Sequence, residues 1–193
     1  MYANTTPDSA SASVLTIPAR EAETVPAHTV LDPILADRYP FEPYSHQAAA
    51  LQALRADEHV CVSTSTASGK THVYGLEIAR RLLEAGVLAH DGTRAVDRNE
   101  AATALCLYPT KALTNDQRDA LDALYDELGL DVRVRVYDGD TPTAERRSIR
   151  EDADVVLTNV QALNVYLEHH DRWSRFYSAL EVVAIDESHT YTG

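Results

Sequence analysis

The hydrophobic pattern of the chain predicts strands that alternate with helices. Short apolar or alternating runs with the length of strands occur at 59–62, 104–108, 132–137, 155–157 and 182–185. Helical spacing follows at 70–85, at 115–128, at the stretch that Pro142 would open as its first helical residue, and again after 157. Strands linked in this way by helices favour an α/β fold, with a mostly parallel sheet covered on both faces.

Three segments follow from the same pattern. Residues 1–28 are rich in Ser, Thr, Ala and Pro without periodicity, which predicts a flexible N-terminal tail. Residues 29–58 form a lead-in with a short helix near Tyr44, capped by Ser45. Residues 59–193 form the α/β domain, with a polar surface loop at 86–100.

Length and composition exclude several classes of protein. The 193 residues suffice for one domain with a core, and no apolar run reaches the roughly 18 to 20 residues that span a bilayer. Because Met1–Arg20 has no signal-peptide pattern, we expect a cytoplasmic protein without a membrane partner. The two cysteines, Cys61 and Cys106, are too few for a disulfide framework or a zinc site and are expected to be buried thiols.

The charge balance bears on whether the chain can bind nucleic acid. Thirty acidic against 17 basic residues give a net charge of -13, which by itself disfavours binding to phosphate. Only two of the basic residues are lysines, Lys70 and Lys111, a pattern that suggests adaptation to a high-salt cytosol, where repulsion is screened. Both lysines lie inside motifs.

The run from Thr64 to Thr71 predicts a phosphate-binding loop, because it stands between a predicted strand and a predicted helix. Backbone N–H groups of such a loop surround phosphate oxygens, Lys70 reaches the β and γ phosphates, and the Thr71 hydroxyl faces Mg²⁺. Thr64 stands where the Walker pattern has glycine, and an ordinary glycine turn is the alternative reading. The expected ATP-binding residues of the loop are Thr66, Ala67, Ser68, Gly69, Lys70 and Thr71.

Two adjacent acids, Asp186 and Glu187, follow the last predicted strand. A phosphate-loop ATPase needs one carboxylate to hold Mg²⁺ and a base to orient the attacking water, roles that suit Asp186 and Glu187 in that order. An acidic pair alone is usually a solvated turn. Together with the phosphate loop, the pair predicts an ATPase whose catalytic residues are Lys70, Asp186 and Glu187, with ATP and Mg²⁺ as cofactors.

The run from Asp186 to His189 resembles motif II of superfamily 2 helicases of the DExH type. Other runs agree: Pro109–Leu113, followed by Asp116 and Gln117, is similar to motif Ia, and Tyr44–Gln47 to the adenine-reading Q motif. Runs at 137–142, 145–150 and 153–159 resemble the group of DNA repair helicases typified by mitomycin repair factor A, the YprA-like group. The resemblance covers about residues 41–193 and implies a RecA-like three-layer sandwich that stops after motif II.

The resemblance also implies roles for single residues. Gln47 would read adenine through its amide, and His189 would couple the ATP site to the second RecA-like domain. Thr71 and Asp186 would face Mg²⁺. The nucleic-acid contacts implied are Pro109, Thr110, Lys111, Gly139, Thr141, Thr158 and Asn159, the last four through loop amides at strand ends. Arg146, Arg147 and Arg150 either meet DNA or form a solvated ion-pair surface.

The sequence therefore predicts the N-terminal part of an ATP-dependent DNA helicase, with a role in DNA repair. In the complete enzyme, hydrolysis would drive translocation on DNA that has a single-stranded region. The second RecA-like domain is not in these 193 residues, so we expect the isolated chain to bind nucleotide weakly and to be inactive. A truncated remnant that only binds DNA or protein is the first alternative, and another phosphate-loop enzyme such as a nucleotide kinase is the second.

Overall fold

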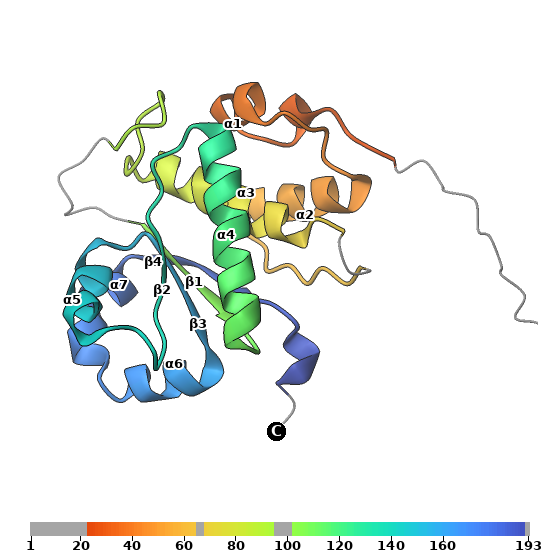
Figure 1. Ribbon diagram of the computed structural model, residues 1–193. Helices are drawn as coiled ribbons and strands as arrows, with labels where there is room; N and C mark the ends of the chain where they lie inside the picture. Colours follow the sequence, from red (N-terminus) through yellow and green to blue (C-terminus); the bar gives the residue numbers. More distant parts are fainter. Residues whose placement is uncertain (1–22, 65–67, 95–101, 192–193) are drawn as a thin grey trace, which may run out of the picture.

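The computed structural model describes residues 23–64, 68–94 and 102–191, and within them a four-stranded parallel sheet (Figure 1). The strands are ordered β2-β3-β1-β4 across the sheet. Their bounds are β1 Thr103–Tyr108, β2 Val134–Val136, β3 Val155–Asn159 and β4 Leu180–Ile185. All three pairings are parallel, which confirms the predicted α/β architecture.

Helices precede, connect and follow these strands. The α-helices are α1 Pro33–Arg38, α2 Ser45–Arg55, α3 Lys70–Glu84, α4 Lys111–Leu128, α5 Thr143–Asp152, α6 Val160–Leu167 and α7 Ser174–Ser178. Short 3-10 helices are η1 Ala27–Thr29, η2 His170–Trp173 and η3 Ser188–Thr190. None of the described helices has the length and hydropathy that a membrane crossing needs.

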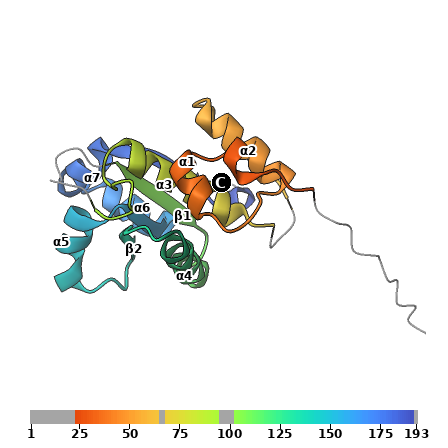
Figure 2. The same ribbon diagram turned by 90° about the horizontal axis from the view of Figure 1, so that it is seen from above.

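The strands divide their side chains between two cores, which makes three layers. Ala104, Cys106 and Tyr108 of β1 pack in the larger core with α2, α3 and α4. Leu105 and Leu107 point the other way, into a second core with residues of α5, α6 and α7. In both views, α1 and α2 lie at the end of the molecule away from α5 (Figures 1 and 2).

Several helix starts differ from the prediction. Tyr44, not Ser45, is the N-cap of α2, because the Gln47 side chain accepts the Tyr44 N–H at 2.8 Å. Helix α4 begins at Lys111 rather than at 115, since the Thr110 hydroxyl accepts the N–H of Leu113. Pro142 occupies the N-cap position of α5, one residue before the helix.

The predicted strand at 59–62 is wrong. Residues 58–64 carry no regular secondary structure, because a strand needs a partner for its backbone groups and no described segment pairs with the outer edge of β4. Val60 and Val62 still pack partly against the larger core. Cys61 points outward and is exposed, against the prediction, whereas Cys106 is fully buried.

Residues 23–28, assigned to the tail from the sequence, are ordered against the lead-in. The Ser45 N–H donates to the Glu23 carbonyl, and Val25 donates to that of Pro43. The tail prediction for residues 1–22 lies outside the described residues. Residues 23–25 are therefore held against the segment around Tyr44, and the division at residue 28 stays a prediction.

Candidate nucleotide and nucleic-acid site

The phosphate-binding loop ends on Gly69, directly before α3. Gly69 adopts the left-handed conformation, with φ at +73°, and turns the chain into the helix. The Lys70 ammonium donates to the Thr64 carbonyl at 3.3 Å, so the lysine folds back over the loop. The hydroxyls of Thr64 and Ser68 are also in contact. The predicted contacts Thr66 and Ala67 lie outside the described residues.

Gln47 attaches helix α2 to this loop. Its Nε2 donates to the Gly69 carbonyl at 2.9 Å, while its Oε1 accepts the N–H of Tyr44. His46 adds a contact of 3.0 Å to the carbonyl of Ser68. Because both ends of the Gln47 amide are engaged and its side chain is buried, reading adenine would require these bonds to be exchanged. The adenine role therefore stays a prediction.

Tyr39 and Phe41 pack near His72, a residue of the first turn of α3. The Tyr39 hydroxyl and His72 Nδ1 are 2.6 Å apart, and the Phe41 ring lies 5.7 Å from the ring of Tyr39. Burial raises the pKa of Tyr39 to about 12 and lowers the pKa of His72. Tyr39 therefore keeps its proton, and burial favours neutral His72. Phe41 is half exposed and offers a flat apolar surface.

The Thr71 hydroxyl donates a hydrogen bond to Gln117 Oε1 at 2.7 Å. The same oxygen accepts the Tyr74 hydroxyl at 2.9 Å. Tyr74 in turn lies 3.0 Å from the hydroxyl of Tyr108, at the end of β1. Burial and neighbouring groups raise the pKa of both tyrosines, so both are protonated donors.

Asp186 lies at the same edge of the sheet as the phosphate-binding loop. It follows β4, and its N–H donates to the carbonyl of Leu107 in β1. Burial is the main cause that raises the pKa of Tyr74, and the nearby Cys106 thiol and Asp186 carboxylate raise it further. The Asp186 carboxylate thus lies near the hydroxyl that bonds to Gln117. Glu187 is next, in a left-handed conformation at φ +48°, and its N–H donates to Asp186 Oδ1. Lys70 and the acids therefore share one rim.

The side chains of this rim fit a magnesium nucleotide. Mg²⁺ prefers oxygen ligands and keeps several waters, so one hydroxyl and one or two carboxylates beside phosphate are sufficient protein groups. The Thr71 hydroxyl and the Asp186 carboxylate are oxygens of this kind, and their role toward Mg²⁺ stays a prediction. With its proton on Gln117, the Thr71 hydroxyl keeps lone-pair capacity that a cation could use. The N-terminus of the 15-residue helix α3 adds N–H groups for phosphate.

The predicted nucleic-acid contacts also gather at the carboxyl ends of the strands. Tyr108 of β1 pairs with Asn159 of β3, so the loop from Pro109 starts beside the residue that opens α6. Lys111 Nζ lies 2.5 Å from Asp140 Oδ2, which joins the start of α4 to the loop after β2. Gly139, Thr110 and Lys111 are exposed there.

Three of the polar side chains in this group already have structural partners. The Thr158 hydroxyl is buried and donates to the Tyr137 carbonyl. Thr141 is buried too, and its hydroxyl accepts the N–H of Asp138. The Asn159 side chain caps α6 by accepting the N–H of Ala162. These bonds shape the loops, and contact between their backbone amides and a strand stays a prediction.

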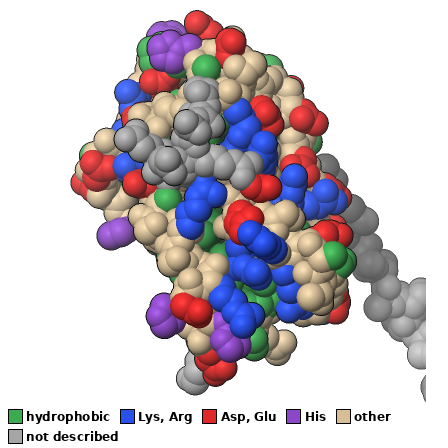
Figure 3. Space-filling model, turned by 90° about the vertical axis from the view of Figure 1, so that its left-hand side faces the viewer, with side chains coloured by type: hydrophobic (Ala, Val, Ile, Leu, Met, Phe, Trp, Pro, Cys, Tyr) green, Lys and Arg blue, Asp and Glu red, His purple; other side chains and the backbone are tan. Residues whose placement is uncertain are grey.

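The three arginines of α5 all bond to other groups of the chain. Arg147 forms an exposed ion pair with Glu151. Arg146 donates to the carbonyls of Thr141 and Gly139, and Arg150 to the Tyr137 hydroxyl. Figure 3 shows Lys and Arg side chains gathered in the middle of one face, with Asp and Glu among them. The mixture resembles a solvated ion-pair surface more than a uniform phosphate track.

His189 stands in η3, is exposed, and has its Nδ1 3.4 Å from Glu187 Oε2. Its predicted role in coupling to a second RecA-like domain stays a prediction. Among the described residues, no group of three or more His, Cys, Asp and Glu side chains is arranged as a metal cluster.

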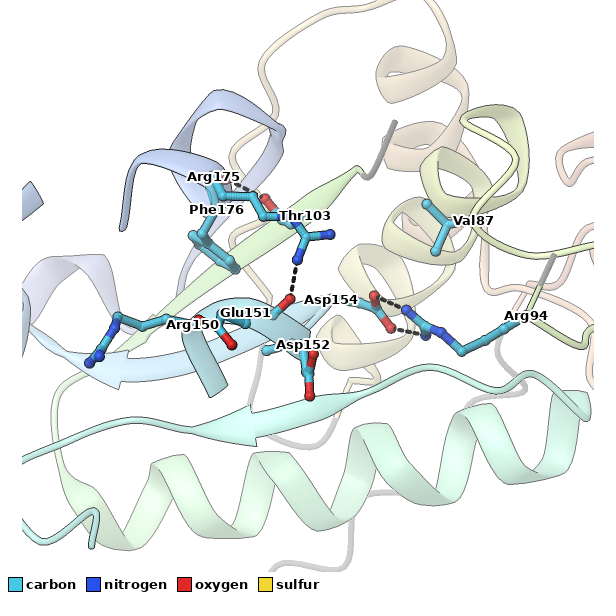
Figure 4. Close-up of a pocket in the computed structure, with 10 residues that line it drawn as sticks. Val87, Arg94, Thr103, Arg150, Glu151, Asp152, Asp154, Arg175 and Phe176 are labelled. Carbon is cyan, nitrogen blue, oxygen red and sulfur yellow. Dashed lines mark hydrogen bonds and ion pairs between the residues drawn. The ribbon is translucent and has the colours of Figure 1, made fainter. Parts of the chain in front are cut away.

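A small pocket lies away from this rim, near the amino ends of β1 and β3 (Figure 4). Its strongest feature is the pair formed by Arg94 and Asp154, with two contacts of 2.6 and 2.7 Å. Because Thr103 and Asp154 stand at the starts of their strands, the pocket is at the opposite end of the sheet from Lys70. Its ion pair is a structural connection.

From the sequence, Gln117, Tyr74 and Asp140 received no role, although Gln117 follows the run that resembles motif Ia and Asp140 lies in the run at 137–142. The position of Tyr74, one helical turn after Lys70, and of Gln117, two turns after Thr110, were visible signals. Nothing in the sequence showed that the Thr71 and Tyr74 hydroxyls of α3 would both donate to the Gln117 side-chain oxygen of α4.

Comparison with known proteins agrees with this geometry. The family model "DEAD/DEAH box helicase" matches residues 44–193. The chain is 36% identical to the uncharacterized ATP-dependent helicase YprA of Bacillus subtilis, over 92% of the chain and 22% of YprA. The crystal structure of the DUF1998 helicase MrfA bound to DNA and AMPPNP superimposes with a TM-score of 0.76 at 36% identity, over 92% of the chain and 24% of MrfA.

A more distant structure, the Mycobacterium smegmatis helicase Lhr bound to ssDNA and AMP-PNP, shares the fold at a TM-score of 0.63 and 22% identity. It covers 86% of the chain and 21% of Lhr. The chain therefore spans between a fifth and a quarter of the length of these relatives. The matches confirm the RecA-like architecture and the resemblance to the YprA and MrfA group, and the chain belongs to the DEAD/DEAH box helicase family.

Proposed function

We propose that this chain is the N-terminal ATP- and DNA-binding part of a longer ATP-dependent DNA helicase. One observation carries the proposal. The end of the predicted phosphate-binding loop, the Asp186–Glu187 pair and the start of α4 at Lys111 all lie at the carboxyl edge of one parallel sheet. Ligands of open α/β sheets bind at that edge, so nucleotide and strand would be neighbours.

The roles of the nucleotide-site residues follow from their chemistry. Lys70 and the N–H groups at the start of α3 would hold the β and γ phosphates. A bound Mg²⁺ would neutralise charge that develops on the phosphates during hydrolysis. Thr71 and Asp186 would hold that ion, and Glu187 would accept a proton from the attacking water. Gln47, Ser68 and Gly69 would position the nucleotide from the α2 side.

The nucleic-acid partner would be DNA with a single-stranded region. MrfA, the relative with the same fold and 36% identity, was crystallised with DNA and AMPPNP together. In this chain Lys111 and Thr110 would hold strand phosphates, as a point charge and a hydroxyl. A second RecA-like domain would complete the ATP site, and His189 would contact it. A role in DNA repair and a cytoplasmic location stay predictions.

A Lys70→Ala variant of the full-length protein that carries this chain tests the proposal. Loss of the ammonium should reduce DNA-stimulated ATP hydrolysis by about 100-fold, because a charge that stabilises the transition state is removed. Binding to single-stranded DNA, measured by fluorescence anisotropy, should stay within about twofold, since Lys70 does not face the strand. Arg147→Ala, an exposed change on α5, serves as the control with normal activity.

Two results would overturn the proposal. Hydrolysis that survives in Lys70→Ala would exclude this loop as the ATP site. Wild-type protein that binds DNA but never hydrolyses ATP would favour a non-catalytic binding remnant.

A further inference from the structure

Gln117 connects the predicted nucleotide site to helix α4, which begins beside the two residues expected to contact DNA, Thr110 and Lys111. It lies on α4, and its Oε1 accepts two hydroxyl protons from α3, from Thr71 at 2.7 Å and from Tyr74 at 2.9 Å. Helix α4 begins at Lys111 after the Thr110 cap, so Gln117 is two helical turns from both.

The proton inventory fixes the direction of these bonds. A hydroxyl has one proton, so Thr71 spends its own on Gln117 and keeps only lone pairs for other partners. Tyr74 also donates to Gln117, and its 3.0 Å contact with Tyr108 therefore uses the proton of Tyr108.

The bond to Gln117 sets the orientation of the Thr71 hydroxyl. Without an acceptor, its hydroxyl rotates, and part of the time its proton points where a cation would stand. With Gln117 Oε1 at 2.7 Å, the proton points toward α4 and a lone pair is left for the opposite side. A preset donor atom binds a metal more tightly, because less conformational freedom is lost on binding.

We infer that Gln117 is a positioning residue, which orients the Thr71 hydroxyl toward the metal of a magnesium nucleotide and ties that hydroxyl to helix α4. The inference rests on the proposed function, since it assumes that the rim binds Mg–ATP. It adds a residue that touches neither the nucleotide nor the metal. Through α4, a shift of the Thr110–Lys111 end on DNA binding would reach Thr71.

Equilibrium binding of a fluorescent ATP analogue to the full-length protein tests this, with Mg²⁺ and with EDTA. The measured quantity is the gain in affinity that Mg²⁺ gives. In Gln117→Met, which keeps the shape of the side chain but removes its oxygen, the gain should fall about five- to tenfold. Affinity in EDTA and the melting temperature should stay near wild type.

Two matched variants separate positioning from simple support of the fold. Tyr74→Phe removes the other hydroxyl from the same Gln117 oxygen, and the Mg²⁺ gain should remain. Gln117→Glu keeps an acceptor for Thr71, and the gain should return. Equal losses in Gln117→Met and Tyr74→Phe would overturn the inference, because Gln117 would then only join two helices.

The remaining outcomes tell the two ideas apart. If wild type gains affinity with Mg²⁺ and Gln117→Met gains as much, the inference fails and the proposed function stands. If wild type binds no nucleotide in either condition, the proposed function fails, and the role of Gln117 fails with it.

Discussion

Lys111 at the start of α4 and Asp140 in the loop after β2 form an ion pair between residues 29 positions apart in the chain, with Nζ 2.5 Å from Oδ2. Both side chains are exposed, at 48% and 78%. A hydrogen bond from Lys111 to Asp140, and the negative charge of Asp140, raise the pKa of the lysine. The lysine expected to hold a strand phosphate thus already holds a carboxylate, which a phosphate would have to replace.

Asp140→Asn should therefore strengthen binding to single-stranded DNA. The carboxylate competes with phosphate for Lys111, and exposed pairs are weak, so we expect a gain of about two- to fivefold in low salt. The gain should shrink as salt rises, because both attractions are screened. Fluorescence anisotropy over a series of KCl concentrations measures it.

Asp119→Asn is the matched control. It removes one carboxylate from an exposed ion pair with Arg118 further along α4, with the same change in net charge. If both variants gain equally, general repulsion explains the effect and Asp140 has no special part. If Asp140→Asn weakens binding, the ion pair holds the loop in a shape that DNA needs.

Gly69 is required twice over at the phosphate-binding loop. Its φ is +73°, and a Cβ there would stand 2.4 Å from Gln47 Nε2. Gly69→Ala should lower the free energy of unfolding by more than the roughly 1–2 kcal/mol of the left-handed conformation, and should abolish nucleotide binding. Urea denaturation and titration with a fluorescent ATP analogue measure the two effects.

Gly86 supplies the control for this prediction. Its φ is +70°, yet a Cβ would meet no atom within 4 Å. Gly86→Ala should show the conformational cost alone and leave nucleotide binding intact. The Gln47→Ala/Gly69→Ala double variant should recover the part that the clash contributes. Equal destabilisation by Gly69→Ala and Gly86→Ala would contradict a clash with Gln47.

The sequence predicted those features that depend on neighbouring residues in the chain. The start of α3 at Lys70 and the acids after β4 lie at one edge of the sheet, because parallel strands bring their carboxyl ends together. The run at 59–62 misled, since an apolar run becomes a strand only beside a partner. The pairs that place Gln117 against Thr71 and Lys111 against Asp140 arise from helix and loop packing, which local patterns do not encode.

The opposite end of the sheet depends on a buried ion pair. Asp154 is 3% exposed and accepts both guanidinium contacts of Arg94, at 2.6 and 2.7 Å, together with the N–H of Arg133 at 2.8 Å. Arg94→Ala would leave a buried carboxylate with only the backbone donor. We expect a loss of about 3 kcal/mol in the free energy of unfolding, measured by urea denaturation at pH 7.

An exposed ion pair is the matched control for this prediction, because its carboxylate stays in water when the arginine is removed. Arg147→Ala, whose partner Glu151 is half exposed, should cost less than about 0.5 kcal/mol. The difference between the two variants measures the cost of leaving the buried Asp154 carboxylate without its guanidinium partner. Equal losses in Arg94→Ala and Arg147→Ala would show that Asp154 is not left as an uncompensated buried charge.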